Sequence, residues 1–191
     1  MKYYQTMTLK DGRTCVLRNG TEADGAGALA VFVLTHEQTD FLRTYPDECE
    51  LTAAQEAAEL KAKTESDREI EIVAEIDGRI VGCAGIEAVG NCSKMRHRAA
   101  FGVSVDQAFW GLGIGRALTE ACIACAKDAG YVQLELDVVG ENTRAIALYQ
   151  SLGFSEFGRN PLGFRSRVSG WQELIHMRFV LKEGAKEEHG T

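Results

Sequence analysis

Apolar residues recur along the chain with two periods, which predict helices in some segments and strands in others. Between residues 114 and 129 they return every three or four positions, the spacing of one face of a helix. Residues 131–139 alternate instead, as a strand does when one of its faces is buried. The same patterns predict further helices over 21–34, 52–63 and 142–152, and further strands over 13–17, 69–76, 79–86, 98–105, 154–157 and 172–181.

Short polar and glycine signals mark the ends of several of these elements. Asp77-Gly78 stands between two strand segments and is typical of a tight β-hairpin turn. Thr52, with Gln55 three residues later, fits a capping box at the start of a helix. Gly130 is placed to end the long helix before it, because glycine takes the left-handed conformation without strain.

The order of the elements predicts an α/β fold of the mixed, α+β kind. Successive strand segments favour a mostly antiparallel sheet with flanking helices. The stretch 98–139 reads strand–helix–strand, and this crossover predicts one parallel strand pair. A glycine-rich loop is expected to join the last two strands. Because no repeat or linker interrupts the pattern, we expect a single domain over residues 1–182 and a disordered, charged tail over 183–191.

Composition and charge exclude several kinds of protein. The 191 residues carry 28 acidic and 21 basic side chains, a net charge of −7 that argues against a nucleic-acid binder and is compatible with a cationic substrate such as an amine. No apolar run is long enough for a membrane helix, and residues 1–10 lack the apolar core of an export signal. We therefore expect a cytoplasmic protein that binds neither nucleic acid nor membrane.

The six cysteines invite comparison with a metal or disulfide set. Cys122 and Cys125 have the C-x-x-C spacing, but they lie within a helical segment and have no second pair of Cys or His nearby. A structural zinc site needs four converging ligands, usually on turns. We expect no bound metal, and reduced thiols as in a cytoplasmic protein.

Three glycines, at 111, 113 and 115, stand between a predicted strand and a predicted helix. Glycines at such a place let backbone N–H groups approach a ligand, and the helix N-terminus favours negative charge, so a phosphate fits there. A P-loop is excluded, because Arg116 and Ala117 stand where Lys and Ser or Thr are required. A dinucleotide fold, with Asp137 as the acid for the ribose, lacks its third glycine and is kept as an alternative.

Two motifs in this region resemble those of the GNAT N-acetyltransferase superfamily. The first, an Arg/Gln-x-x-Gly-x-Gly/Ala stretch after a strand, corresponds to residues 110–115. The second, an Asn-x-x-Ala-x-x-Leu-Tyr stretch that ends in Gly-Phe, corresponds to residues 142–154. The order of elements over 13–181 also matches that fold, so the resemblance covers nearly the whole chain and implies an acyl-CoA N-acyltransferase fold. Trp110 departs from the motif, because it stands at the Arg/Gln position.

The resemblance implies acetyl-CoA as the co-substrate and gives roles to particular residues. Main-chain groups of Val103 and Val105 are expected to bind the pantetheine arm as an added strand would. Tyr149 is expected near the thioester sulfur as a general acid, and Asn142 is expected to contact the cofactor besides capping its helix. The pyrophosphate is expected to lie on the main-chain amides of Gly111, Gly113, Ile114, Gly115 and Arg116.

The implied reaction is direct attack of a primary amine on the thioester in a ternary complex. The amine must lose a proton near pH 7, so a general base is required. Glu135 is the first candidate, because it lies on the strand beside the cleft, and Glu87 and His97 follow. The acceptor is left open between peptide N-termini, antibiotics, amino acids and polyamines. An acidic, aromatic-edged amine site is expected from Phe41, Tyr45, Glu48, Glu50 and Glu87.

Two functions of other classes stay open beside the transferase. One is a dinucleotide-binding oxidoreductase, and the other is a non-catalytic CoA-binding regulator on the same fold. Tyr149 favours the enzyme over the regulator, because a binding module has no need of a phenol at the thiolate. A homodimer is expected only by resemblance to the family.

Overall fold

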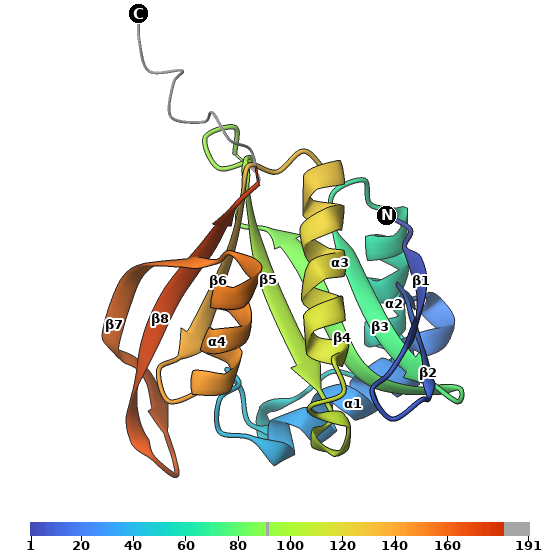
Figure 1. Ribbon diagram of the computed structural model, residues 1–191, viewed down its shortest axis with the longest axis horizontal. Coiled ribbons are helices and arrows are strands. Elements are labelled where there is room, and N and C mark those ends of the chain that lie inside the picture. Colours follow the sequence, from blue (N-terminus) through green and yellow to red (C-terminus); the bar gives the residue numbers. More distant parts are fainter. Residues whose placement is uncertain (91, 182–191) are drawn as a thin grey trace, which may run out of the picture.

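The computed structural model describes residues 1–90 and 92–181, and within them eight strands form one sheet with helices on both of its faces (Figure 1). The tail predicted over 183–191 lies outside the described residues. The strands are β1 (Tyr4–Thr8), β2 (Thr14–Asn19), β3 (Ile70–Ile76), β4 (Arg79–Ala88), β5 (Arg98–Val105), β6 (Gln133–Val139), β7 (Ser155–Ser166) and β8 (Gly170–Val180). The α-helices are α1 (Gly25–Gln38), α2 (Ala53–Glu65), α3 (Ile114–Asp128) and α4 (Thr143–Leu152).

The sheet has the order β1-β2-β3-β4-β5-β6-β8-β7. Among the described strands β5 and β6 form the one parallel pair, and the other neighbours are antiparallel, as the crossover predicts. In Figure 1, α3 and α4 lie in front of the sheet and α1 and α2 lie behind it. The core fills the space between α3 and the middle strands, where Leu118 and Cys122 are fully buried.

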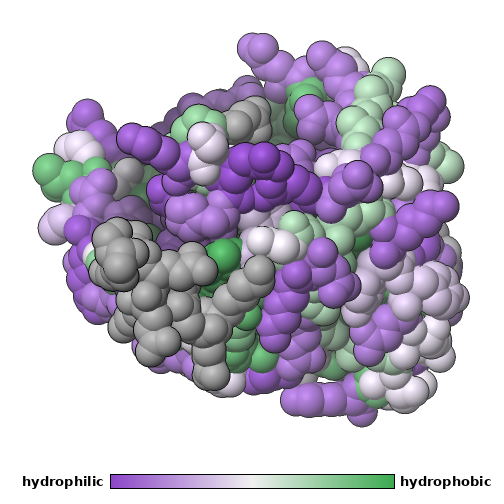
Figure 2. Space-filling view, turned by 90° about the horizontal axis from the view of Figure 1, so that it is seen from above, coloured by the Kyte–Doolittle hydropathy of each residue, from purple (hydrophilic) through white to green (hydrophobic). Residues whose placement is uncertain are grey.

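The parallel pair of β5 and β6 is short, and the strands leave space between them where their pairing stops. Ladder pairing of β5 with β6 starts at Arg98↔Gln133 and ends at Ala100↔Glu135. Beyond that point the two strands separate toward their carboxyl ends (Figure 1). At the opposite end, where both strands begin, the surface is mainly hydrophilic, with apolar side chains only in small scattered areas (Figure 2).

The glycine and capping signals hold in detail. The hairpin between β3 and β4 turns at Asp77 and Gly78, which both have positive φ. Thr52 caps α2, and its side chain accepts a hydrogen bond from the amide of Gln55 at 3.2 Å. Gly130 has a φ of 77° just beyond α3. The first helix differs from its prediction: a short 3-10 turn precedes α1, which runs on to Gln38.

Of the two edge strands, β1 was not predicted and only the first residues of β7 were. β1 carries mostly exposed, polar residues, and no buried alternation marks it. β7 replaces most of the glycine-rich loop expected between residues 157 and 172, and it is an edge strand whose ladder shifts register between Asn160 and Phe164. Pro161 falls within that shift, where its missing N–H breaks no ladder bond. The glycine, asparagine and proline residues of this irregular edge strand therefore look like a loop in the sequence.

Candidate active site

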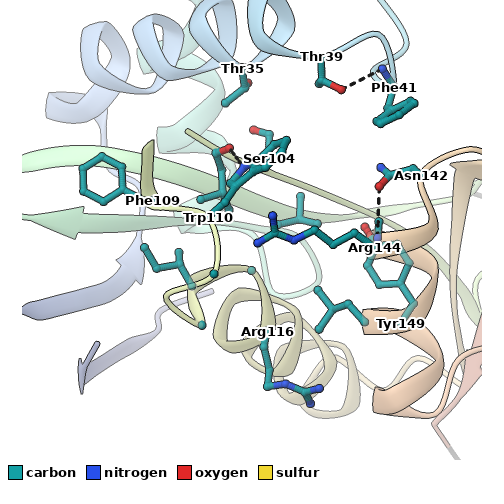
Figure 3. Close-up of a pocket in the computed structure, with 18 of the residues that line it drawn as sticks. Thr35, Thr39, Phe41, Ser104, Phe109, Trp110, Arg116, Asn142, Arg144 and Tyr149 are labelled. Carbon is teal, nitrogen blue, oxygen red and sulfur yellow. Dashed lines mark hydrogen bonds between the residues drawn. The ribbon is translucent and has the colours of Figure 1, made fainter. Parts of the chain in front are cut away.

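Beside the unpaired end of β5 lies a groove of about 500 Å³ (Figure 3). Its walls come from β5, the glycine turn, the first turn of α3, α4 and the end of α1. Nine residues that the sequence singles out for acetyl-CoA or for proton transfer line it: Val103, Val105, Gly111, Gly113, Ile114, Gly115, Arg116, Asn142 and Tyr149. The fold thus brings both motifs to one cavity.

The glycine turn has the backbone geometry that a bound anion requires. Gly111 and Gly113 have φ values of 84° and 99°, in the left-handed region that favours glycine. Gly113 is the N-cap of α3 and has no side chain to bond the first amides of the helix. The first intrahelical bond is donated by Ala117 to the Gly113 carbonyl at 3.1 Å. The amides of Ile114 to Arg116 precede that bond and have no acceptor within the helix.

A buried carboxylate, which the sequence analysis did not identify, holds the start of this turn. Asp106 is only 2% exposed and directly follows β5. Its Oδ1 accepts from the amide of Ala108 at 3.1 Å and from Nε2 of Gln38 at 2.9 Å, and its Oδ2 accepts from Arg79 at 2.7 Å. Asp106 therefore fixes the turn to α1 and to β4 at once.

Trp110, the departure from the family motif, has its own bonding arrangement. Its Nε1 donates a 2.7 Å hydrogen bond to the carbonyl oxygen of Val105. The guanidinium of Arg144 lies 5.0 Å from the indole centroid, an attractive cation–π geometry. Figure 3 shows Arg144 reaching from α4 toward Trp110. The indole therefore connects the end of β5 with α4 through side-chain contacts.

The end of β5 offers main-chain groups to the groove. The amide of Asp106, one residue beyond the strand, still donates to the Val81 carbonyl on the β4 side at 2.9 Å. Alternate residues of an antiparallel strand turn both N–H and C=O to the same neighbour, so Val103 and Val105 turn theirs away from β4. On that side β6 has already diverged, since its last partner on β5 is Ala100. An extended ligand can add to this edge as a strand does.

Tyr149 lies on α4 with its ring in an aromatic cluster. It is 8% exposed, and its ring stands edge-on to Phe101 at 6.2 Å and 5.7 Å from Phe154. Burial raises the pKa of its hydroxyl to about 12, so the phenol keeps its proton at neutral pH. Asn142 caps the same helix by accepting from the Ala145 amide at 3.2 Å (Figure 3).

Positive side chains border the groove although the whole chain is acidic. Lys10 and Arg144, which the sequence analysis did not identify, line it together with Arg116. Arg116 is held at the rim by Ser151 Oγ at 2.6 Å and by Glu120 at 3.6 Å. Among the described residues, neither Lys10 nor Arg144 forms an ion pair. The groove therefore presents free positive charge where a polyanion would lie.

None of the three residues considered as the general base lines the groove. Glu135 does not line the groove, and its carboxylate accepts from Arg98 at 2.7 Å. Burial raises the pKa of Glu135, but hydrogen bonds from Arg98 and Gln133 outweigh that effect and lower it below its ordinary value. Glu87 pairs with Lys63 at 2.8 Å, and His97 is exposed. The structure therefore does not bring Glu135 together with the other site residues.

The segment after α1, which holds both aromatic residues expected at the acceptor site, contacts the tip of the β7–β8 hairpin. Asp40, just after α1, accepts hydrogen bonds from Ser166 Oγ at 2.7 Å and Ser169 Oγ at 2.7 Å, at the tip of the β7–β8 hairpin. Arg167 pairs with Asp47 at 2.8 Å, and its guanidinium lies 4.1 Å from the Tyr45 ring centroid. Of the aromatic residues proposed for this site, Phe41 lines the groove, whereas Tyr45 joins this contact.

Metal and membrane features are not found in the part of the chain that the structure describes. No cluster of three or more His, Cys, Asp or Glu side chains there is arranged to hold a metal ion. Cys122 and Cys125 are buried in α3 as free thiols. None of the described helices has the length and apolar character of a membrane span.

Comparison with known proteins matches this geometry. The family model described as "Acetyltransferase (GNAT) family" matches residues 31–154, which include both motifs. Human N-acetyltransferase 8B is 36% identical over 109 residues, a stretch that covers 56% of this chain and 45% of that relative. The chain thus spans less than half the length of this relative.

Solved structures share the fold over most of the chain. The acetyltransferase of the GNAT family from Streptococcus pneumoniae superposes with a TM-score of 0.83 and 26% identity, covering 87% of this chain and 99% of that one. An acetyltransferase from Salmonella typhimurium, solved with its cofactor acetyl-CoA, gives a TM-score of 0.78 at 23% identity and covers 90% of this chain and 96% of its own.

Proposed function

The chain belongs to the acetyltransferase (GNAT) family, and from this premise we propose that it transfers the acetyl group of acetyl-CoA to a primary amine. One observation carries the proposal. The unpaired edge of β5, the left-handed glycine turn and the phenol of Tyr149 all border a single groove of about 500 Å³. Each of these features suits a different part of acetyl-CoA.

The binding roles follow from the groove's own groups. The amides of Gly111, Gly113, Ile114, Gly115 and Arg116 hold the pyrophosphate at the N-terminus of α3. Lys10 and Arg144 add positive charge for the phosphates. The main-chain groups of Val103 and the N–H of Val105 form hydrogen bonds to the pantetheine arm. The carbonyl oxygen of Val105 is not used, because it already accepts a hydrogen bond from Trp110. Asn142 contacts the cofactor from the start of α4.

The chemical roles need one acid and one base. Acetyl-CoA supplies an activated acyl group as its thioester. Tyr149 stays protonated at neutral pH and can give a proton to the sulfur that leaves. Glu135 is the general base expected from the sequence. Because its carboxylate is already paired with Arg98, its role in removing the proton has to be tested by substitution.

The partner in this proposal is an amine-bearing small molecule or peptide, met in the cytoplasm, and the enzyme is expected to be a homodimer. Calorimetric titration of the full chain with acetyl-CoA, and separately with NAD, tests the binding step. Thiol release with tyramine, spermidine and tetra-alanine as acceptors tests the transfer. Binding of acetyl-CoA with turnover on an amine supports the proposal. Binding of NAD alone favours the oxidoreductase, and binding of acetyl-CoA with no turnover on any amine favours the regulator.

A further inference from the structure

A second cavity, of about 330 Å³, lies against the same end of β5 on the side of the sheet that α1 and α2 cover. Its lining comes from α1, the segment after it, α2, β3, β4 and β5. Three residues line both this cavity and the groove: Leu42, Val103 and Ser104. The two spaces therefore lie against the same residues of β5, the strand to which the proposed function assigns the pantetheine arm.

His36 faces the second cavity with a fixed tautomer. Its Nδ1 lies 2.7 Å from the carbonyl oxygen of Phe32, and its ring centroid lies 3.9 Å from that of the Phe32 ring. Because a carbonyl oxygen only accepts, Nδ1 carries the hydrogen, and the neutral ring presents a lone pair at Nε2. No side chain or main-chain group among the described residues bonds Nε2. The adjacent residue, Thr35, lines the groove instead.

The protonation state of His36 agrees with this geometry. Burial lowers the pKa of His36 below its ordinary value, and the hydrogen bond to Phe32 only partly offsets that effect. The ring is therefore neutral at pH 7 and able to accept a proton. Cys83, the other nucleophilic group in the lining, is a half-buried thiol, and its removal from water raises its pKa well above the ordinary value.

The floor of the second cavity leaves room for a ligand next to β5. Gly102 has no atom within 4 Å of the position that a Cβ would take. Its partner on β4 is Gly85, and the carboxylate of Glu71 lies over that glycine, where a Cβ would clash with it. Two glycines thus open a space on β5 that the half-buried carboxylate of Glu71 borders.

The charges around this space favour a cation. Glu56, Glu71 and Glu87 line the cavity from α2, β3 and β4, and Arg43 lines it from the segment after α1. Lys63 lies 3.1 Å from Glu71 and 2.8 Å from Glu87. The carboxylate of Glu56 has no such partner among the described residues. Counted as ionised, the three carboxylates outnumber the two cations by one. Burial raises the pKa of Glu56 and of Glu71 above the ordinary value, and an ammonium group beside them would favour their ionised form.

We propose that the second cavity binds the amine acceptor and that Nε2 of His36 is the general base, an inference that rests on the proposed acetyl transfer. The carboxylates draw the ammonium group in, and Nε2 removes one of its protons. The neutral nitrogen then forms a bond to the acetyl carbon as the bond from that carbon to sulfur breaks. Nitrogen gives up a second proton to water as the amide forms, and Tyr149 regains from water the proton that it gave to sulfur. The imidazolium of His36 then releases its proton to solvent, so that the products are the amide, the free thiol of CoA and one proton.

The test uses the full chain with saturating acetyl-CoA and the same three amines as probes. In His36→Gln, we expect kcat/KM to fall about 10²–10⁴-fold and its acidic limb to disappear, with unchanged affinity for acetyl-CoA. The matched control is His176→Gln on β8, whose ring pairs with Asp137 at 2.6 Å and lines neither cavity. That control should keep the wild-type profile. An acidic limb that persists in His36→Gln but disappears in Glu135→Gln would overturn the inference.

A second measurement does not depend on the acceptor. Nitrogen-15 spectra of the histidines, assigned with the two variants, report the tautomer and the titration of His36 in the wild-type protein. We expect hydrogen on Nδ1 and titration below about pH 6.5. Hydrogen on Nε2, or a cationic ring at pH 7, would exclude the proposed base whatever the kinetics show. Failure of the proposed function is seen separately, as absence of acetyl-CoA binding by the wild-type chain.

Discussion

Trp110 and Val105 are joined by a 2.7 Å hydrogen bond from the indole Nε1 to the main-chain carbonyl oxygen. The bond runs back from the glycine turn to the end of β5, the two parts of the groove to which we assign different portions of acetyl-CoA. A residue that departs from the family motif therefore has a definite structural role. Its side chain links the edge of β5 to the glycine turn.

Replacing Trp110 by Phe removes this bond and keeps an aromatic ring beneath Arg144. We expect acetyl-CoA affinity to fall roughly three- to tenfold, because one intramolecular hydrogen bond contributes about 0.5–1.5 kcal/mol. Amide hydrogen exchange at Gly111 and Gly113 should become faster. Trp171→Phe is the matched control, since that tryptophan is 57% exposed on β8 and does not line the groove. Equal affinity and equal exchange in both variants would contradict the proposed role.

Gly113→Val should close the pyrophosphate site. The residue has a φ of 99°, which a β-branched side chain tolerates poorly, and the added groups would stand where the phosphate approaches. We expect acetyl-CoA affinity to fall at least tenfold, about 1.4 kcal/mol, in calorimetry. Gly130→Val places the same strain, at a φ of 77°, beyond the far end of α3. Comparable loss of affinity in both variants would show that strain, and not the site, is responsible.

Tyr149→Phe tests the general acid. The ring and its contacts with Phe101 and Phe154 stay, so only the hydroxyl is lost. We expect kcat to fall about 10²–10⁴-fold while acetyl-CoA binding barely changes. Tyr131→Phe is the control, because that hydroxyl is buried, does not line the groove and has no hydrogen-bond partner among the described residues. Full turnover by Tyr149→Phe would leave proton delivery to water.

The same variant has a consequence for stability at high pH. The pKa of Tyr149 is about 12 in the folded protein, above its ordinary value of 10.0, so the unfolded chain loses this proton first as pH rises. The free energy of unfolding therefore falls between about pH 10 and pH 12 on account of this group. Denaturant titrations should show a shallower alkaline loss for Tyr149→Phe than for the wild type. Parallel curves would show that the hydroxyl is solvated.

The parts of the site that the sequence predicts are the parts made by backbone. Gly113, Gly130 and Gly153 all have positive φ, and they set the ends of α3 and α4. Because glycine marks these positions directly, the boundaries of both helices and the groove between them follow from local signals. The hydrogen bond by which Asn142 caps α4 likewise joins residues close in sequence, Asn142 and Ala145.

The parts that the sequence does not predict depend on tertiary contacts. His36 carries no motif, and its importance comes from a cavity that three distant strands complete. Asp106 resembles a turn residue until Gln38 and Arg79 are seen to bind it. Glu135 has the position of a base on its strand, but the start of β5 brings Arg98 against it. Local patterns do not show which charges a fold will pair.

Asp24 provides a stability prediction with a defined pH dependence. Arg18 binds its carboxylate at 2.7 Å and 2.8 Å, and this contact lowers the pKa of Asp24 to about 2. The unfolded chain therefore takes up this proton first as pH falls, and the stabilisation, complete above about pH 4, is lost toward pH 2. Asp24→Asn should cost about 2 kcal/mol at neutral pH, and less as the pH is lowered. Asp11→Asn, at an exposed pair with Arg13, should change little.

Asp40 lies 126 positions before Ser166, and the hydrogen bonds between them tie the end of α1 to the tip of the β7–β8 hairpin. Closing so long a stretch of chain is entropically costly and slow, whereas the groove wall from Val103 to Tyr149 is built from contacts closer in sequence. The order of assembly follows from this difference. During refolding, we expect the strand edge, the glycine turn and α4 to come together first, and the hairpin to dock on the segment after α1 later. The protein should then regain its hold on acetyl-CoA before it regains discrimination among amines.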